Sequence, residues 1–154
     1  MSKHLLLFPR LAPLFAAAAF LTAETAHVTP FTGAWTMNPA KSHFNPPTPF
    51  KSFTMTFTPD GVRHLDLLTA DDQSVKVELP WSDGKEVPVS GMENAVATSK
   101  LQGRKFNDTW RQNGKLIETV HGVVSSDGRT VTITIDGTDA QNRAFHNRLT
   151  FEKQ

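Results

Sequence analysis

The sequence predicts an all-β protein, an antiparallel up-and-down meander of about eight strands that closes into a barrel. Short runs alternate apolar and polar residues, as in FTMTF (53–57), VKVEL (75–79) and VTITI (131–135). Pro-Asp-Gly, Asp-Gly and Asn-Gly turn signals interrupt such runs, at the roughly 8–12-residue spacing that is typical of sandwiches and barrels. A meander has two unpaired edges, and closure into a barrel removes them.

Residues 1–23 are predicted to be a secretory signal peptide, which leaves 24–154 as a single barrel domain. Lys3 and Arg10 accompany an apolar run that ends at Ala23, and the segment contains no acid. This layout is typical of an export signal, and the run is shorter than the roughly 20 apolar residues of a membrane span. An uncleaved anchor is the alternative. We therefore expect a periplasmic or secreted protein that contacts the membrane only through this segment.

Charge and cysteine usage exclude several classes of function. The chain has 16 Lys and Arg against 15 Asp and Glu, so removing a segment with two basic residues and no acid changes the net charge from +1 to −1. Nucleic acid is therefore not an expected partner. The absence of cysteine excludes disulfides, thiol nucleophiles and zinc-thiolate sites. The histidines show no metal-ligand spacing, so neither a metal nor a cofactor is predicted.

Turn lengths predict the strand register on the apolar face. A three-residue Pro-Asp-Gly loop sets Met55 opposite Leu65. The later Asp-Gly turn and the loop before the last strand set Ile133 opposite both Gly122 and Leu149. One apolar face then runs across neighbouring strands, whereas a one-residue slip would bring polar residues onto it.

The Asn113–Gly114 hairpin leaves two registers open. A plain two-residue turn sets Phe106 opposite His121, on the polar side. A one-residue bulge returns Phe106 to Gly122.

Inward apolar positions are the candidate contacts for a small ligand, because a barrel of about eight strands encloses either a packed core or one small molecule. Gly122 and Gly137 lie on this inward face and would leave space beside larger side chains; the alternative is that they only relieve bending at barrel corners. The candidate ligand-binding residues are Phe53, Met55, Phe57, Leu65, Gly122, Ile133 and Leu149.

The opening stretch, GAWTMNPAKSHFNPP, resembles the start of the lipocalin-like, or calycin, barrels. Those folds begin with a Gly-x-Trp strand, as Gly33 and Trp35 provide here, followed by an irregular segment like 38–49. With its GTDAQNR turn and FEKQ ending, the chain is also similar to a set of small, exported, uncharacterised bacterial lipocalin-like proteins. The resemblance covers residues 31–154.

This resemblance implies roles for a few residues. Trp35 would pack under the barrel floor against an arginine of the last strand, with Arg148 the nearest match and Arg143 the alternative. The Arg-x-Tyr anchor with which fatty-acid-binding barrels hold a carboxylate lacks its tyrosine, since the chain has none.

An Asp–His pair is the one candidate for catalytic chemistry. The predicted register sets Asp136 directly across from His146 on the polar face, where the two side chains would form an acid/base site. An ordinary cross-strand charge pair on a solvated outer face is the favoured interpretation, because the apolar face needs the interior.

The function predicted from the sequence is therefore non-enzymatic binding of a small hydrophobic molecule by an exported barrel. One alternative is a structural, interaction or inhibitor module with a packed interior. The other is a barrel enzyme that uses Asp136 and His146.

N-terminal sequencing of the exported protein tests the signal segment. We expect the mature chain to begin near Glu24, because the charge layout before it is that of a cleaved signal. Recovery of intact Met1 on a soluble cytoplasmic protein would contradict this expectation.

Overall fold

The computed structural model describes residues 28–45 and 50–154, so the predicted signal segment lies outside the described residues. The described chain forms a short 3₁₀ helix, η1 (Pro39–Lys41), and ten strands. No helix in this part of the chain is long and apolar enough to cross a membrane. The strands are β1 (Gly33–Met37), β2 (Phe50–Phe57), β3 (Val62–Thr69), β4 (Ser74–Pro80), β5 (Val87–Pro88), β6 (Ala95–Gln102), β7 (Lys105–Gln112), β8 (Lys115–Val124), β9 (Thr130–Thr138) and β10 (Ala144–Lys153).

The predicted antiparallel all-β class is confirmed, but the predicted count of about eight strands is wrong. Ten strands form one sheet. The count is too low because β5 has only two residues, too few for an alternating pattern. In addition, β6 and β7 are joined by a tight turn at Gly103, which none of the Asp-Gly or Asn-Gly signals marks.

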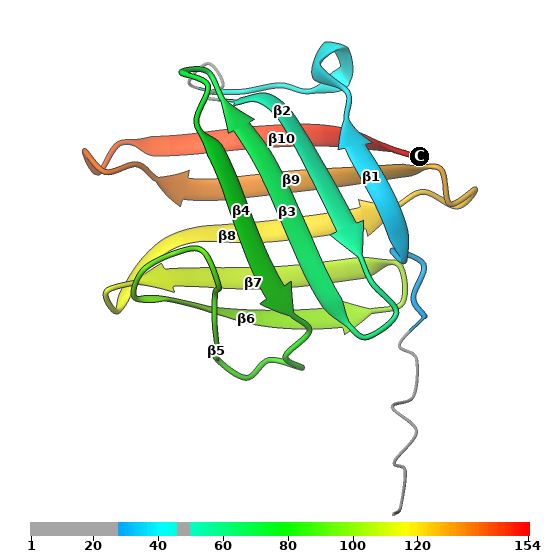
Figure 1. Ribbon diagram of the computed structural model, residues 1–154, viewed down its shortest axis with the longest axis horizontal. Helices are drawn as coiled ribbons and strands as arrows, with labels where there is room; N and C mark the ends of the chain where they lie inside the picture. Colours follow the sequence, from blue (N-terminus) through cyan, green and yellow to red (C-terminus); the bar gives the residue numbers. More distant parts are fainter. Residues whose placement is uncertain (1–27, 46–49) are drawn as a thin grey trace, which may run out of the picture.

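The sheet curls into a nearly closed barrel. Its strand order is β4-β3-β2-β1-β10-β9-β8-β7-β6-β5, so the first and last strands of the chain pair in its middle. The two edges, β4 and β5, meet through a bridge between Glu78 and Ser90, whose backbones exchange two hydrogen bonds of 3.1 Å. In Figure 1, β1 to β4 cross steeply in front of β6 to β10, so two layers enclose the interior.

The opening motif lies where the first strand of the chain pairs with the last. Gly33 has a φ of +122°, a conformation that favours glycine, and Trp35 lies on β1 between β2 and β10. After η1 the chain continues along β10, where His43 and Arg148 exchange backbone hydrogen bonds of 2.7 and 2.8 Å. The irregular segment therefore extends the pairing of β1 with β10 as far as Asn45; residues 46–49 lie outside the described part.

The three registers predicted from turn lengths are confirmed. Met55 pairs with Leu65, and Ile133 pairs with Gly122 on one side and Leu149 on the other. The buried residues of these strands follow the same alternation, so the apolar face points into the barrel as the pattern predicts.

Of the two registers left open at the Asn113–Gly114 hairpin, the bulged one is observed. The pairing of β7 with β8 shifts between Trp110 and Arg111, which sets Phe106 opposite Gly122 and Trp110 opposite Glu118. The bulge keeps the large aromatic side chains of β7 inside the barrel.

One half of the interior is closed by aromatic rings. Trp35 is fully buried, and its indole N–H donates a 2.6 Å hydrogen bond to the carbonyl oxygen of Phe31. Four other rings pack against one another with their centroids 5.2–6.4 Å apart, within the range of favourable aromatic pairs. These are Phe31, Phe57, Trp81 and Phe106.

The cation over the Trp35 ring is Lys153, with its Nζ atom 5.1 Å from the ring centroid. The sequence resemblance implied Arg148 instead. Arg148 is exposed and pairs with Thr134 on the outward side of β10. Lys153 pairs directly with Trp35, and its position on β10 has the parity of the inward residues, which Arg148 lacks.

Replacing Trp35 with alanine should lower the free energy of unfolding by about 3–5 kcal/mol, because a fully buried aromatic side chain leaves a cavity when it is truncated. Urea melts measure the loss. Leu116→Ala is the control, since Leu116 is exposed and its truncation should cost little. A loss below about 1 kcal/mol for Trp35→Ala would contradict the buried placement.

Candidate binding cavity

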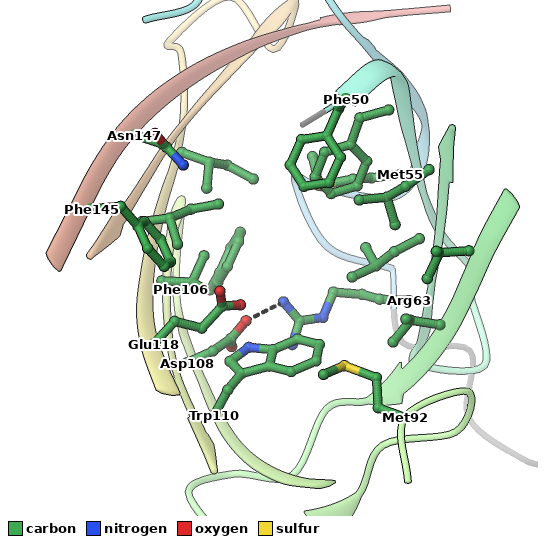
Figure 2. Close-up of a pocket in the computed structure, with 18 of the residues that line it drawn as sticks. Phe50, Met55, Arg63, Met92, Phe106, Asp108, Trp110, Glu118, Phe145 and Asn147 are labelled. Carbon is green, nitrogen blue, oxygen red and sulfur yellow. Dashed lines mark hydrogen bonds and ion pairs between the residues drawn. The ribbon is translucent and has the colours of Figure 1, made fainter. Parts of the chain in front are cut away.

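The other half of the barrel interior holds a cavity of about 470 Å³. Its wall is mainly aliphatic and aromatic and includes Leu67 and Val75 beside the β3–β4 turn and Phe145 at the start of β10. Figure 2 shows Phe50 and Met55 on one wall, with Phe145 and Asn147 on the other. The volume lies within the roughly 300–1,000 Å³ of small-molecule sites.

Four of the seven residues predicted to contact a ligand line this cavity: Phe53, Met55, Leu65 and Ile133. The remaining three, Phe57, Gly122 and Leu149, are not among its lining residues. Phe57 belongs to the aromatic cluster, where its ring stacks on Trp81, and Leu149 is fully buried. Contact between any of the seven and a ligand remains a prediction.

Gly122 leaves space in the barrel, but an aromatic ring occupies that space. A Cβ atom at Gly122 would lie 2.0 Å from Cε1 of Phe106, its cross-strand partner. At Gly137 an added Cβ would lie 2.5 Å from the carbonyl oxygen of Ile117 and 2.6 Å from Cζ of Phe145, its cross-strand partner. Each inward glycine thus admits the ring of the residue opposite.

A buried ion pair crosses the interior at the inner end of the cavity. Arg63 on β3 and Asp108 on β7 are each 3% exposed, and Nη1 of Arg63 donates a 2.6 Å hydrogen bond to Oδ2 of Asp108. Figure 2 shows the arginine reaching from one wall to the carboxylate on the other. The pair joins the two layers of the barrel, since β3 belongs to the front layer and β7 to the back.

Other groups compensate part of the desolvation of Arg63. Its Nη2 atom donates a 3.0 Å hydrogen bond to the hydroxyl of Ser99. The guanidinium carbon lies 4.4 Å from the centroid of the Trp81 ring and 5.0 Å from that of Phe106, which are favourable cation–π distances. Arg63 therefore separates the aromatic half of the barrel from the cavity.

A second carboxyl group, that of Glu118 on β8, lies at the same end of the cavity. Burial raises its pKa from the ordinary 4.5 to about 7, and the charge of Asp108 adds to this effect. Figure 2 shows Glu118 beside Asp108, with the Trp110 indole below them. The inner end of the cavity is therefore polar and titrates near neutral pH.

The sequence contained a signal for this polar cluster. Arg63 has the same strand parity as Leu65, and Asp108 the same parity as Phe106 and Trp110, so the alternation that points those apolar residues inward also points both charges inward. Sorting the inward face by apolar residues alone misses them. Glu118 has the same parity as Val120 and Gly122, so the register predicted from the Asp-Gly turn points it inward as well. Only the inward direction of Asp108 depended on the register left open at the Asn113–Gly114 hairpin.

The Asp136–His146 pair lies on the outer surface. The two residues pair across β9 and β10 as predicted, with Nδ1 of His146 2.6 Å from Oδ1 of Asp136 and each side chain 60% exposed. Neither residue lines the cavity. Within residues 28–45 and 50–154, no group of three or more His, Asp or Glu side chains is arranged to hold a metal ion.

The barrel is similar in fold to several solved structures. Fluorescent protein UnaG matches with a TM-score of 0.52 and 14% identity, over 80% of this chain and 97% of its own. Lipid binding protein 8 of Caenorhabditis elegans matches with a TM-score of 0.52 and 11% identity, over 81% and 96% of the two chains. A variant of the REP1-NXSQ fatty acid transporter matches with a TM-score of 0.50 and 10% identity, over 80% and 97%.

These likenesses establish the fold alone, because the sequence identities are so low. No family model matches the chain, and no curated protein sequence matches it. The predicted resemblance to a lipocalin-like calycin barrel is thereby confirmed at the level of architecture.

Glu118 should make the stability of the barrel depend on pH. Its pKa is higher in the folded chain than the ordinary 4.5, so the folded state binds this proton more tightly than the unfolded state. Its contribution to stability is therefore full below about pH 4.5 and is lost as the pH rises through about 7, by at most about 3 kcal/mol. Urea melts of the wild type and Glu118→Gln at pH 5 and pH 8 should show this loss only in the wild type.

Glu93→Gln is the control for that experiment, because Glu93 is exposed in the turn before β6 and its replacement should leave the wild-type pH dependence in place. Equal pH dependence in the wild type and Glu118→Gln would contradict the assignment.

Proposed function

We propose that this protein is an exported, non-enzymatic binding protein that holds a small, mostly apolar molecule inside its barrel. The observation that carries the proposal is the cavity of about 470 Å³, apolar along its walls and polar at its inner end. Small-molecule sites combine a mainly hydrophobic lining with a few placed polar groups. Export rests on the charge layout of residues 1–23.

The solved structures of similar fold support a lipid-like ligand. Two of them are named as a lipid binding protein and a fatty acid transporter. A shared fold does not transfer a ligand, so these names support the class of molecule, whereas the identity of the ligand depends on the side chains of this barrel.

The cavity argues against the alternative of a structural module with a packed interior. Protein interiors are close-packed, with few voids larger than a water molecule, and a cavity of this size would be a costly defect in a protein without a ligand.

The positions of Asp136 and His146 argue against the enzyme alternative. Both residues lie outside the barrel, away from the cavity that would hold an apolar substrate.

Filling the cavity should block binding. Val120 on β8 lines the cavity, so Val120→Phe should lower the affinity for the neutral fluorophore Nile red at least tenfold, because the new ring occupies space that the probe needs. Gly122→Leu is unsuitable for this test, since its side chain would collide with Phe106.

Val123→Phe is the matched control, because Val123 lies on the same strand and does not line the cavity. Its Nile red titration and thermal melt should match those of the wild type. A wild-type protein that does not bind Nile red, or equal losses in the two variants, would reject the proposal and favour the packed structural module.

A further inference from the structure

Three polar atoms at the inner end of the cavity are buried and have no hydrogen-bond partner within residues 28–45 and 50–154. They are Nε of Arg63, Oδ1 of Asp108 and Nε1 of Trp110, and all three residues line the cavity. Buried polar groups in folded proteins are nearly always hydrogen-bonded, and one without a partner needs an explanation. Two of these atoms are N–H donors, whereas the carboxylate oxygen of Asp108 is an acceptor.

The charged side chains that face the cavity together disfavour an anionic ligand. Arg63 on β3 is neutralised by Asp108 on β7 at 2.6 Å, and Glu118 on β8 adds a second carboxyl. Asp139, after β9, also lines the cavity, and its carboxylate is paired with Arg143 at 2.7 Å. The lining residues that β2, β4 and β10 contribute are uncharged. A ligand carboxylate at the inner end would meet two acidic side chains and a cation that already has a partner.

The hydrogen-bonding capacity of the three unpartnered atoms further narrows the kinds of ligand head group that fit this end of the cavity. A carboxylate only accepts hydrogen bonds and has nothing to donate to Asp108. An ammonium group only donates and leaves the N–H groups of Arg63 and Trp110 without an acceptor. An amide or a hydroxyl group both accepts and donates, so it complements both kinds of contact that the inner end of the cavity offers.

We propose that the cavity selects apolar molecules whose buried end is an uncharged amide or hydroxyl group, and that it discriminates against fatty carboxylates. This inference rests on the proposed function, because it names the ligand class of the same cavity. The hydrocarbon part of the ligand would contact the apolar wall from Phe53, Met55 and Ile133. The uncharged end would accept a hydrogen bond from Arg63 or Trp110 and donate one to Asp108.

Four ligands that share the same hydrocarbon chain and differ only in their head groups test the proposal. Dodecanamide, dodecanol, dodecanoate and dodecylamine are titrated against the purified protein loaded with Nile red, at pH 6 and pH 8. We expect the amide and the alcohol to displace the probe at concentrations at least tenfold lower than the carboxylate and the amine. Dodecanoate should weaken further at pH 8, where Glu118 is ionised in most molecules.

Asp108→Asn should reverse the preference. Removal of the acidic partner frees the Arg63 charge to attract an anion, so the affinity for dodecanoate should rise at least tenfold. Asp66→Asn is the matched control on β3, since Asp66 is exposed and does not line the cavity, and it should leave all four affinities unchanged.

A second variant keeps the test decisive if Asp108→Asn fails to fold. Glu118→Gln should strengthen dodecanoate binding severalfold at pH 8 and much less at pH 6, with little effect on the amide. Equal displacement by all four ligands, or tightest binding of dodecanoate or dodecylamine to the wild type, would overturn the head-group inference while leaving the binding function intact. Absence of Nile red binding in the wild type would overturn both.

Discussion

The buried pair of Arg63 and Asp108 is the interaction around which the interior of this barrel is arranged. Two charges taken out of water are expensive, and their attraction offsets that cost only where geometry and further hydrogen bonds are good. Here the bond is short and direct, Ser99 accepts a second hydrogen bond from the guanidinium, and the rings of Trp81 and Phe106 lie against it. The pair thus links the two layers of the sheet through the interior of the barrel. The edges of the sheet, β4 and β5, are joined separately, by the bridge between Glu78 and Ser90.

This pair also divides the interior into two halves with different physical properties. On one side, aromatic rings pack within 5.2–6.4 Å of one another, and inward Gly122 admits the ring of Phe106. On the other side, the walls are apolar and the space between them is open. The packed rings support the guanidinium of Arg63, which lies against Trp81 and Phe106, and precise placement of polar groups at a binding site requires such support.

The sequence predicted the fold well because alternation and turn chemistry act locally. A Pro-Asp-Gly loop fixes one register by its length, and the observed pairing of Met55 with Leu65 follows from it.

Other features could not be predicted from local patterns. The strand β5 has only two residues, and alternation needs more positions than two. The cation over Trp35 was also missed, because the contact of Lys153 with Trp35 depends on how the first and last strands pair, and that pairing is not local. The polar cluster of the cavity was predictable in part. Arg63 and Glu118 have inward parity in registers that the turn lengths determine, whereas the inward direction of Asp108 depended on a bulge that they do not.

The same argument explains why the ligand cannot be inferred from the fold. The backbone of a calycin-type barrel sets which positions point inward, but each inward position is free to carry an apolar, acidic or basic side chain. In this chain the inward positions at one end carry one cation, two acids and an indole. Replacement of Arg63, Asp108 and Glu118 by apolar residues would preserve the alternation and the register while removing every charge from the inner end. The fold therefore supplies an apolar container, and a few side chains at its inner end decide which head group is stable inside it.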